Sequence, residues 1–287
     1  MKRKIGVGVA IVVAVAITAG LAPGWWVNGH ATITEAAAAK LPDEVPAFYR
    51  NAGKLLAHFA GDPDRWKNRT TPTLRAAEEG NHFLDLEDLE GKELPQSSRF
   101  LGAKVVLDLK REPNKVGTLP YAIQEGYERL ACAFYDYRQD PNNEAIRMKC
   151  LVYGGWLAHY TTDISMPLHT TRNYDGMVPA DGKLLLQKGI HAKIDGFPEK
   201  FKITADEICR GLEANPPDDI WAYTFKTFKE SHQQIEKCYQ LDALKAFDTP
   251  TEESRAFILS RCRAGAQFTM DVWTAAWKKS ATMPPHY

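Results

Sequence analysis

Residues 146–169 read IRMKCLVYGGWLAHYTTDISMPLH, and this stretch carries both the fold signal and the chemical signal of the chain. The spacing of apolar residues over 146–160 is typical of an amphipathic helix. His159 and Asp163 are four residues apart, so a helix puts the imidazole and the carboxylate on one face. Pro167 would end that helix and return His169 toward the same face. The stretch predicts a helix that ends in a group of potential metal ligands.

The same helical spacing recurs at 46–59, 121–136 and 251–278. Strand-like alternation is scarce, and no internal repeat or linker is visible. Gly, Pro and Asp collect in four expected loops, at 61–72, 88–97, 174–182 and 215–219. The sequence therefore predicts an all-α fold, a single-domain helical bundle of roughly eight to ten helices.

Composition excludes some classes of protein. The 36 basic and 36 acidic residues give a net charge of zero over 287 residues. This balance excludes a strongly basic nucleic-acid coat protein and a polybasic membrane-surface protein, but not an enzyme that handles a few phosphates at a time. Apolar residues make up 44% and charged residues 25%, which is typical of a globular domain with a sizeable core.

The first 24 residues differ from the rest. Three basic residues at 2–4 precede an uncharged stretch at 5–22 and then Pro23-Gly24. This pattern predicts a signal peptide over 1–24, with a mature domain over 25–287 that is secreted or periplasmic. The alternative is an uncleaved membrane anchor, because the stretch is of borderline length for a bilayer. Export permits disulfides, but the sequence does not pair an odd set of five cysteines: Cys132, Cys150, Cys209, Cys238 and Cys262.

A second H-x3-D pair follows, His191 and Asp195. Together with His159, Asp163 and His169 it supplies three imidazoles and two carboxylates within 37 residues. Zinc accepts this set of nitrogen and oxygen ligands, and closely spaced zinc ions need a bridging carboxylate. The alternative is two capped helices with incidental histidines.

Two more histidines lie near the start of the chain. His82 stands in NHFLDLED (81–88) and His30 in WWVNGHAT (25–32). The ordinary alternative for His82 is a turn before an acidic segment. The ordinary alternative for His30 is a helix entry with Trp anchors. If cleavage follows Gly24, however, Trp25 becomes the N-terminus, and its α-amino group has a near-neutral pKa and can bind a metal.

These motifs, taken in order, resemble the zinc-dependent single-strand nucleases of the S-one/P-one type, which share a fold with bacterial zinc phospholipases C. The resemblance covers nearly the whole chain after residue 24. It implies a helical bundle with three zinc ions in a cleft. The implied ligands are Asp64, His82, His159 and Asp163 for the first zinc; His169, His191 and Asp195 for the second; and Trp25 (amino group and carbonyl), His30 and the bridging Asp163 for the third.

The resemblance also implies the chemistry. Zinc lowers the pKa of a bound water toward neutrality, so a hydroxide can attack a phosphodiester, with Asp163 and Asp64 as the catalytic carboxylates. No GxSxG motif offers a nucleophile instead. Asp62 and Asp64 both flank Pro63, so either could be the metal ligand. The run DRWK favours Asp64.

Different segments of the sequence favour different substrates. The spacing from Trp25 to His30, the run HFLDLED and an Asp at 195 resemble the nucleases, whereas GIHAKIDGF (189–197) resembles the phospholipases. In the nucleases the positions of Phe83 and Asp85 stack on and hydrogen-bond a base, and that of Lys67 contacts phosphate. Ordinary alternatives for these three are a core aromatic, a helix cap and a surface lysine.

We therefore expect a zinc-dependent endonuclease that prefers single-stranded DNA and RNA. The alternative is a zinc-dependent phospholipase C that hydrolyses phospholipid head groups. A lesser alternative is a non-catalytic exported protein that binds zinc. No protein partner is evident, and a monomer is expected.

Overall fold

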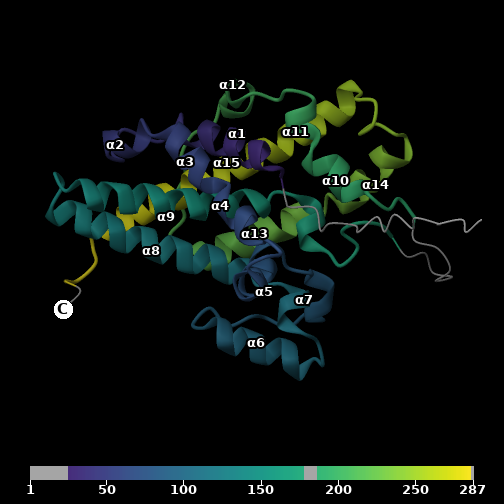
Figure 1. Ribbon diagram of the computed structural model, residues 1–287, viewed down its shortest axis with the longest axis horizontal. Coiled ribbons are helices and arrows are strands. Elements are labelled where there is room, and N and C mark those ends of the chain that lie inside the picture. Colours follow the sequence, from purple (N-terminus) through teal and green to yellow (C-terminus); the bar gives the residue numbers. More distant parts are fainter. Residues whose placement is uncertain (1–24, 178–185, 286–287) are drawn as a thin grey trace, which may run out of the picture.

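The computed structural model describes residues 25–177 and 186–285, and all regular secondary structure in these ranges is helical (Figure 1). An isolated antiparallel bridge joins Met177 and Leu186. The longer helices are α1 (Val27–Ala38), α3 (Gly53–Ala60), α6 (Arg99–Asp108), α8 (Leu119–Gln139), α9 (Glu144–Asp163), α13 (Ile220–His232), α14 (Ile235–Ala243) and α15 (Glu252–Ser280). The shorter ones are α2 (Ala47–Arg50), α4 (Asp62–Trp66), α5 (Pro72–Glu78), η1 (Glu79–His82), η2 (Leu86–Leu89), α7 (Pro113–Val116), η3 (Pro167–Thr170), α10 (Ile190–Asp195), α11 (Phe197–Lys200) and α12 (Ala205–Cys209).

Helix α9 is the centre of the bundle. It packs against α8 along most of its length and also against α3 and α15, while α1 packs between α3 and α15 (Figure 1). Its first turn is fixed by Asn143, whose side-chain oxygen accepts hydrogen bonds from the backbone N–H groups of Ala145 and Ile146. The helix ends at Asp163, before the loop that leads to Pro167. The last turn of α9 therefore lies where several helices converge.

Two glycines allow α9 to lie close to its neighbours. A Cβ atom at Gly154 would lie 1.9 Å from the Tyr49 hydroxyl of α2, and one at Gly155 would lie 2.4 Å from the Phe59 Cβ of α3. Trp273 of α15 donates a hydrogen bond to the Gly154 carbonyl from a fully buried position. The absence of side chains at these two positions sets how closely α2 and α3 approach α9.

The all-α prediction is confirmed, and the helices expected at 121–136, 146–160 and 251–278 are α8, α9 and α15. The helix expected over 46–59 is instead two helices, α2 and α3, because the chain turns between them. The loop expected over 61–72 was wrong in part, since α4 occupies its first half. The described residues hold more helices than predicted, because helices of four or five residues are too short to show a hydrophobic period.

In the described part of the chain, no helix is long and apolar enough to cross a membrane. The predicted signal peptide over 1–24 and its alternative, an anchor, lie outside the described residues. All five cysteines are described, and each of them is a free thiol.

Candidate metal centre

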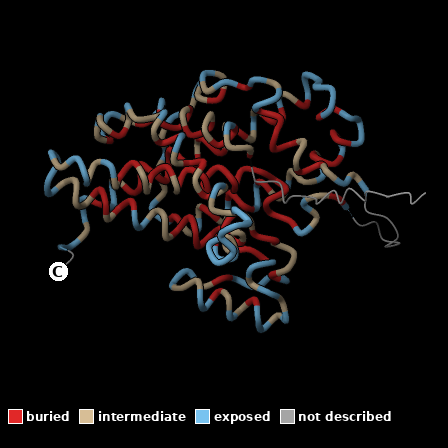
Figure 2. The backbone as a smooth tube through the Cα atoms, viewed as in Figure 1, coloured by how far each residue is buried: buried red, intermediate tan, exposed pale blue. Residues whose placement is uncertain are grey.

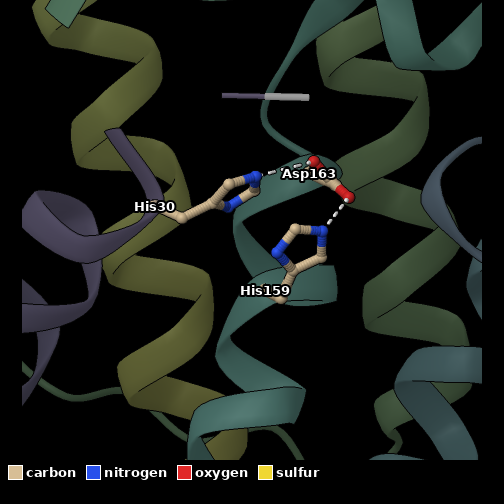
Figure 3. A group of neighbouring side chains, drawn as sticks. All are labelled: His30, His159 and Asp163. Atoms are coloured by element: carbon tan, nitrogen blue, oxygen red, sulfur yellow. Dashed lines mark ion pairs between the residues drawn. The ribbon is translucent and has the colours of Figure 1, made fainter. Parts of the chain in front are cut away.

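Asp163, in the last turn of α9, is the hub of the site. Its fully buried carboxylate contacts four imidazoles from four different elements. Figure 3 shows two of them, His30 from α1 and His159 from α9, facing its two oxygens. The four distances to Asp163 are 3.4 Å from His30 Nε2 and 3.3 Å from His169 Nδ1 to Oδ1, and 3.1 Å from His82 Nδ1 and 3.3 Å from His159 Nε2 to Oδ2.

Asp64, His82 and His159 form the first of three groups that could hold a metal ion. The Asp64 Oδ1 atom lies 4.0 Å from His82 Nδ1 and 3.8 Å from His159 Nε2. The two imidazole nitrogens are 2.9 Å apart. The other nitrogen of His159 is 2.7 Å from the Ala60 carbonyl oxygen, which fixes its tautomer and leaves Nε2 free to bind.

His30, His159 and Asp163 form a second group. It lies near the first turn of α1, which Trp25 and Trp26 precede. The His30 Nδ1 atom lies 2.6 Å from the Thr162 hydroxyl, so its Nε2 faces Asp163. Trp25 is fully buried, and its indole N–H donates to the Thr162 carbonyl at 3.2 Å. These contacts hold residue 25 beside the last turn of α9.

His169, His191 and Asp195 form the third group. The Nε2 atoms of His169 and His191 are 3.0 Å apart, and His191 Nε2 is 3.3 Å from Asp195 Oδ2. Because His169 also contacts Asp163 through its Nδ1, it links this group to the other two. The N–H of Trp26 donates to the Asp195 carbonyl at 3.3 Å, which ties the start of α1 to α10.

The buried atoms of these groups test whether they suit a metal. Buried polar atoms in proteins almost always have a hydrogen-bond partner. Here several that face one another have no such partner among the described residues, and their nitrogens and carboxylate oxygens are ligands that zinc prefers. The atoms are His30 Nε2, Asp163 Oδ1, His169 Nδ1, Asp195 Oδ1 and Asp195 Oδ2. The residues present therefore fit a zinc centre.

Burial and neighbouring charges set the protonation of the groups. Burial, followed by a neighbouring imidazole, holds the pKa of His30 and of His191 well below the usual value, so both rings are neutral. Although burial opposes it, the surrounding imidazoles lower the pKa of Asp163 well below its usual range. Burial raises the pKa of Asp195 well above its usual range, helped by Asp163 and Asp64. Neutral imidazoles are the form that binds a metal.

Lys67 and Asp64 form an ion pair of 2.8 Å at the edge of the site. Burial raises the pKa of Asp64, but Lys67 and then the imidazoles outweigh it and lower that pKa to about 2. Asp62 points elsewhere: its carboxylate accepts hydrogen bonds from Arg65 at 2.7 Å and from the Trp156 indole at 3.2 Å. Of the two carboxylates that flank Pro63, the structure thus brings Asp64 to the histidines.

Glu78 is a buried neighbour of the site that sequence reasoning missed. Its Oε1 atom accepts a hydrogen bond of 2.5 Å from the Tyr160 hydroxyl and lies 3.5 Å from His82 Nε2. A carboxylate behind a ligating imidazole orients the ring and raises its basicity. The four-residue step from Glu78 to His82 is a signal that could have revealed it, since it matches the spacing of the two H-x3-D pairs.

A cavity of about 570 Å³ opens beside the histidines. Its wall carries His82, His169 and His191 together with the three predicted substrate residues, Lys67, Phe83 and Asp85. The backbone N–H of Leu84 donates to the His169 carbonyl and that of Asp85 to the Val116 carbonyl, so the segment after His82 is hydrogen-bonded to both η3 and α7. The remaining lining residues are Glu79, Glu112, Asn114, Lys115, Leu168 and Tyr174.

Asp85 is a buried acid in this wall. Burial raises its pKa to about 8, with Asp88 and Glu87 adding to the effect. The carboxyl group is therefore mostly protonated at neutral pH and can donate a hydrogen bond as well as accept one.

No protein-family model matches the sequence, and no curated protein matches it. The solved structures that resemble the fold weakly include two clostridial toxins. The alpha toxin from Clostridium absonum has a TM-score of 0.48 and 14% identity, over 90% of this chain and 66% of the toxin chain. The alpha-toxin from an avian strain of Clostridium perfringens has a TM-score of 0.45 and 16% identity, over 89% of this chain and 64% of the toxin chain. The chain spans slightly less than two thirds of each toxin, and similarity at this level supports no conclusion about activity.

Proposed function

We propose that the protein is a zinc-dependent phosphodiester hydrolase. The observation that carries the proposal is the convergence on one carboxylate, Asp163, of three nitrogen- and oxygen-rich groups beside a cavity. A purely structural zinc site is closed by four protein ligands, whereas these groups offer three residues each. Zinc bound there would supply Lewis acidity and a water of near-neutral pKa.

The ligands of three zinc ions follow from the same groups. Asp163 would bridge, because its two oxygens face different imidazoles. The neutral rings of His30 and His191 would bind without first losing a proton. Asp64, kept ionised by Lys67, is the second catalytic carboxylate of the proposal. The proposed ligands are Trp25, His30, Asp64, His82, His159, Asp163, His169, His191 and Asp195.

For the substrate we propose single-stranded nucleic acid. Phe83 offers a π-face and Asp85 a hydrogen-bonding carboxyl in the cavity wall directly after the ligand His82. An unpaired base can enter such a pocket, whereas a base in a duplex is stacked and paired. Lys67 could contact a phosphate of the substrate. To do so it would have to weaken its ion pair with Asp64.

Phospholipid is the second candidate substrate. The specific observation in its favour is an exposed apolar face on α6, with Phe100 81% exposed, on the segment that leads into α7 and the cavity wall. A lipid substrate has to be reached at a surface, and exposed apolar side chains beside a cavity suit that task.

The third zinc would need a processed N-terminus. We propose cleavage between Gly24 and Trp25, which frees the Trp25 amino group beside His30 and places the mature protein outside the cytoplasm. The hydrogen bonds from the Trp25 indole to Thr162 and from the Trp26 backbone N–H to Asp195 support this, because they hold residues 25 and 26 next to two of the three groups. We further propose that the mature protein acts as a monomer.

The test is a substrate panel on zinc-loaded protein that begins at Trp25, with the Asp163→Asn variant as the inactive control. We expect hydrolysis of single-stranded DNA and RNA well above duplex, and loss of activity with a chelator. Release of a phosphorylated head group from phosphatidylcholine, with single strands untouched, would replace the nuclease with the phospholipase. Zinc binding with no hydrolysis of any phosphodiester would leave the non-catalytic zinc protein.

A further inference from the structure

Tyr174 places an exposed aromatic ring beside the metal centre. Residues 157–171, which run from the last turns of α9 through η3, are all buried (red in Figure 2). Three residues later Tyr174 is 40% exposed, and it lines the same cavity as His169 and His191. Its ring packs edge-on against the His191 ring, with the two centroids 5.6 Å apart. The tyrosine side chain is therefore open to the cavity directly beside a proposed metal ligand.

The loop that carries Tyr174 is held in place on both sides of this residue. The Tyr239 hydroxyl donates a hydrogen bond of 2.5 Å to the carbonyl of the preceding residue and accepts one of 3.2 Å from the Gly176 N–H. The carboxylate of the next residue, Asp175, accepts a hydrogen bond of 3.3 Å from the backbone N–H of His191. An exposed ring on a backbone that is already fixed loses little conformational freedom when a ligand stacks on it, which favours binding.

Phe83 offers a second aromatic ring in the same cavity wall, from a different part of the chain. It is half-buried, and its ring lies against Gly117 at the end of α7, where a Cβ atom would be only 2.9 Å from the Phe83 Cδ2. One ring is thus supported from behind by Gly117 and the other by His191, and both line the cavity. Nucleic-acid bases stack on aromatic side chains of this kind.

The two rings lie beside different metal groups. Phe83 directly follows His82, whose Nδ1 is 3.1 Å from Asp163 Oδ2. Tyr174 packs against the third group, in which His169 Nδ1 is 3.3 Å from Asp163 Oδ1. The groups next to the two rings therefore contact different oxygens of the same carboxylate.

A nucleic-acid strand suits this arrangement, because every internal phosphate carries a nucleoside on each side. The cavity volume of about 570 Å³ lies within the range of about 300–1,000 Å³ that is typical of small-molecule sites, so the cavity is large enough for more than one ring. Stacking on an aromatic side chain tolerates any base, since every base has a π-face. Two such contacts would add affinity without adding sequence preference.

We propose that Tyr174 stacks on a second base of the substrate, on the opposite side of the scissile phosphate from the base at Phe83. The proposal rests on the proposed function, because it requires a phosphate held at the groups around Asp163. The preferred substrate is then an internal phosphodiester flanked by two nucleosides. If Tyr174 served only to support the His191 ring, its removal would instead lower zinc content and leave the substrate preference unchanged.

The test compares three small phosphodiesters of thymidine on zinc-loaded protein that begins at Trp25. One is the thymidine dinucleotide, and in each of the other two a methyl group replaces the nucleoside on one or the other side of the phosphate. We expect Tyr174→Ala to raise KM about tenfold for the dinucleotide and for one of the methyl esters, because a base loses its aromatic stacking partner. Phe83→Ala should raise KM for the dinucleotide and for the other methyl ester.

Two further variants control for the loop and for the ring. Met177→Ala removes a side chain of similar exposure, 38%, from the same loop, and Met177 is not among the described residues that line the cavity. This variant should hydrolyse all three compounds as the wild type does. Tyr174→Phe keeps the ring and should recover most of the affinity lost in Tyr174→Ala. Elemental analysis should find the wild-type zinc content in every variant.

The proposal is overturned by an unchanged KM for the dinucleotide in Tyr174→Ala, or by a loss of affinity for the same methyl ester in both alanine variants. It is also overturned if Tyr174→Ala loses zinc in proportion to its activity. In each of these cases the wild type still hydrolyses the dinucleotide, so the proposed function stands. If the wild type hydrolyses none of the three compounds and no oligonucleotide, the proposed function fails, and the second base site fails with it.

Discussion

Two regions of the molecule depart from the usual distribution of polar and apolar groups, in opposite directions. Around Asp163, charged and polar side chains are fully buried, and several of their atoms have no hydrogen-bond partner among the described residues. On α6, large apolar side chains have half or more of their surface exposed to water. Each arrangement costs free energy in the isolated chain. The zinc proposed above would satisfy the buried groups around Asp163, whereas no described residue covers the apolar face of α6.

The largest effect is expected for Asp163→Asn. Asp163 contacts four imidazoles, so its loss should remove more than one zinc ion per chain and lower kcat by about a thousandfold or more. Elemental analysis and single-strand hydrolysis measure the two effects. Asp62→Asn is the control, because Asp62 faces Arg65 and Trp156, and it should keep its zinc. Full zinc content in the Asp163 variant would show that the buried carboxylate is not a bridge.

Extra residues before Trp25 should have the next largest effect. They convert the proposed amino ligand into an amide, so the protein should lose one zinc ion and most of its activity. Intact mass and zinc content of exported protein provide the measurement. A mature start at Trp26 or later, with full activity, would exclude this ligand.

Glu78→Gln should reduce zinc affinity or activity by about 10- to 100-fold, the usual effect of losing the partner of a ligating histidine. The glutamine keeps the size of the side chain and can still accept the Tyr160 hydrogen bond. Glu79→Gln is the matched control, since Glu79 is the next residue and pairs with Arg75. A zinc titration in which both variants equal the wild type would limit the metal centre to its direct ligands.

Phe83→Ala should raise KM for oligonucleotides about tenfold, because stacking on an aromatic ring contributes about 1–3 kcal/mol per base. Zinc content should not change, since Phe83 is not in any of the three groups. An unchanged KM would assign Phe83 to packing alone.

Asp85→Asn tests the cost of a buried acid. The folded-state pKa of Asp85 is raised to about 8, so folded protein retains a proton that the unfolded chain releases near pH 4. Wild-type stability contributed by this group falls as pH rises from about 4 to about 8. The Tm of the variant relative to that of the wild type should therefore rise by several degrees between pH 5 and pH 8. A constant Tm difference over that range would contradict the raised pKa.

The smallest effect is expected in the other region. Phe100→Asp with Leu107→Asp should change Tm by less than about 2 °C, because exposed side chains contribute little to stability. Differential scanning calorimetry of the double variant and of wild type measures this. A large loss of Tm would mean that these residues belong to the core of the protein, and the contrast between the two regions would disappear.

Local spacing explains what could be read from the sequence. His159 with Asp163, and His191 with Asp195, lie one helical turn apart, so a helix alone places each pair together. The long helices were predictable for the same reason. The approach of His82 to Asp163 depends instead on the packing of α9 with η1, which no local pattern encodes.

Exposure was the harder property to predict. The apolar residues of α6 look like core residues in the sequence, and only the packed structure shows that one face is left uncovered. Short helices such as α4 escaped notice because a segment of five residues has no measurable period. Asp62 and Asp64 are separated by a single residue, so the sequence alone could not establish which of them lies beside the histidines. The structure shows that their carboxylates point in different directions.

The two adjacent glycines of α9 have a consequence for how freely the chain can evolve. Gly154 and Gly155 lie one turn before His159 and bind no metal, yet any side chain there would push away Tyr49 and Phe59. Because α3 supplies the Ala60 carbonyl that fixes the His159 ring, such a push would reach the metal centre through the backbone. In a library of random substitutions, these two chemically inert positions should tolerate as little variation as the histidines.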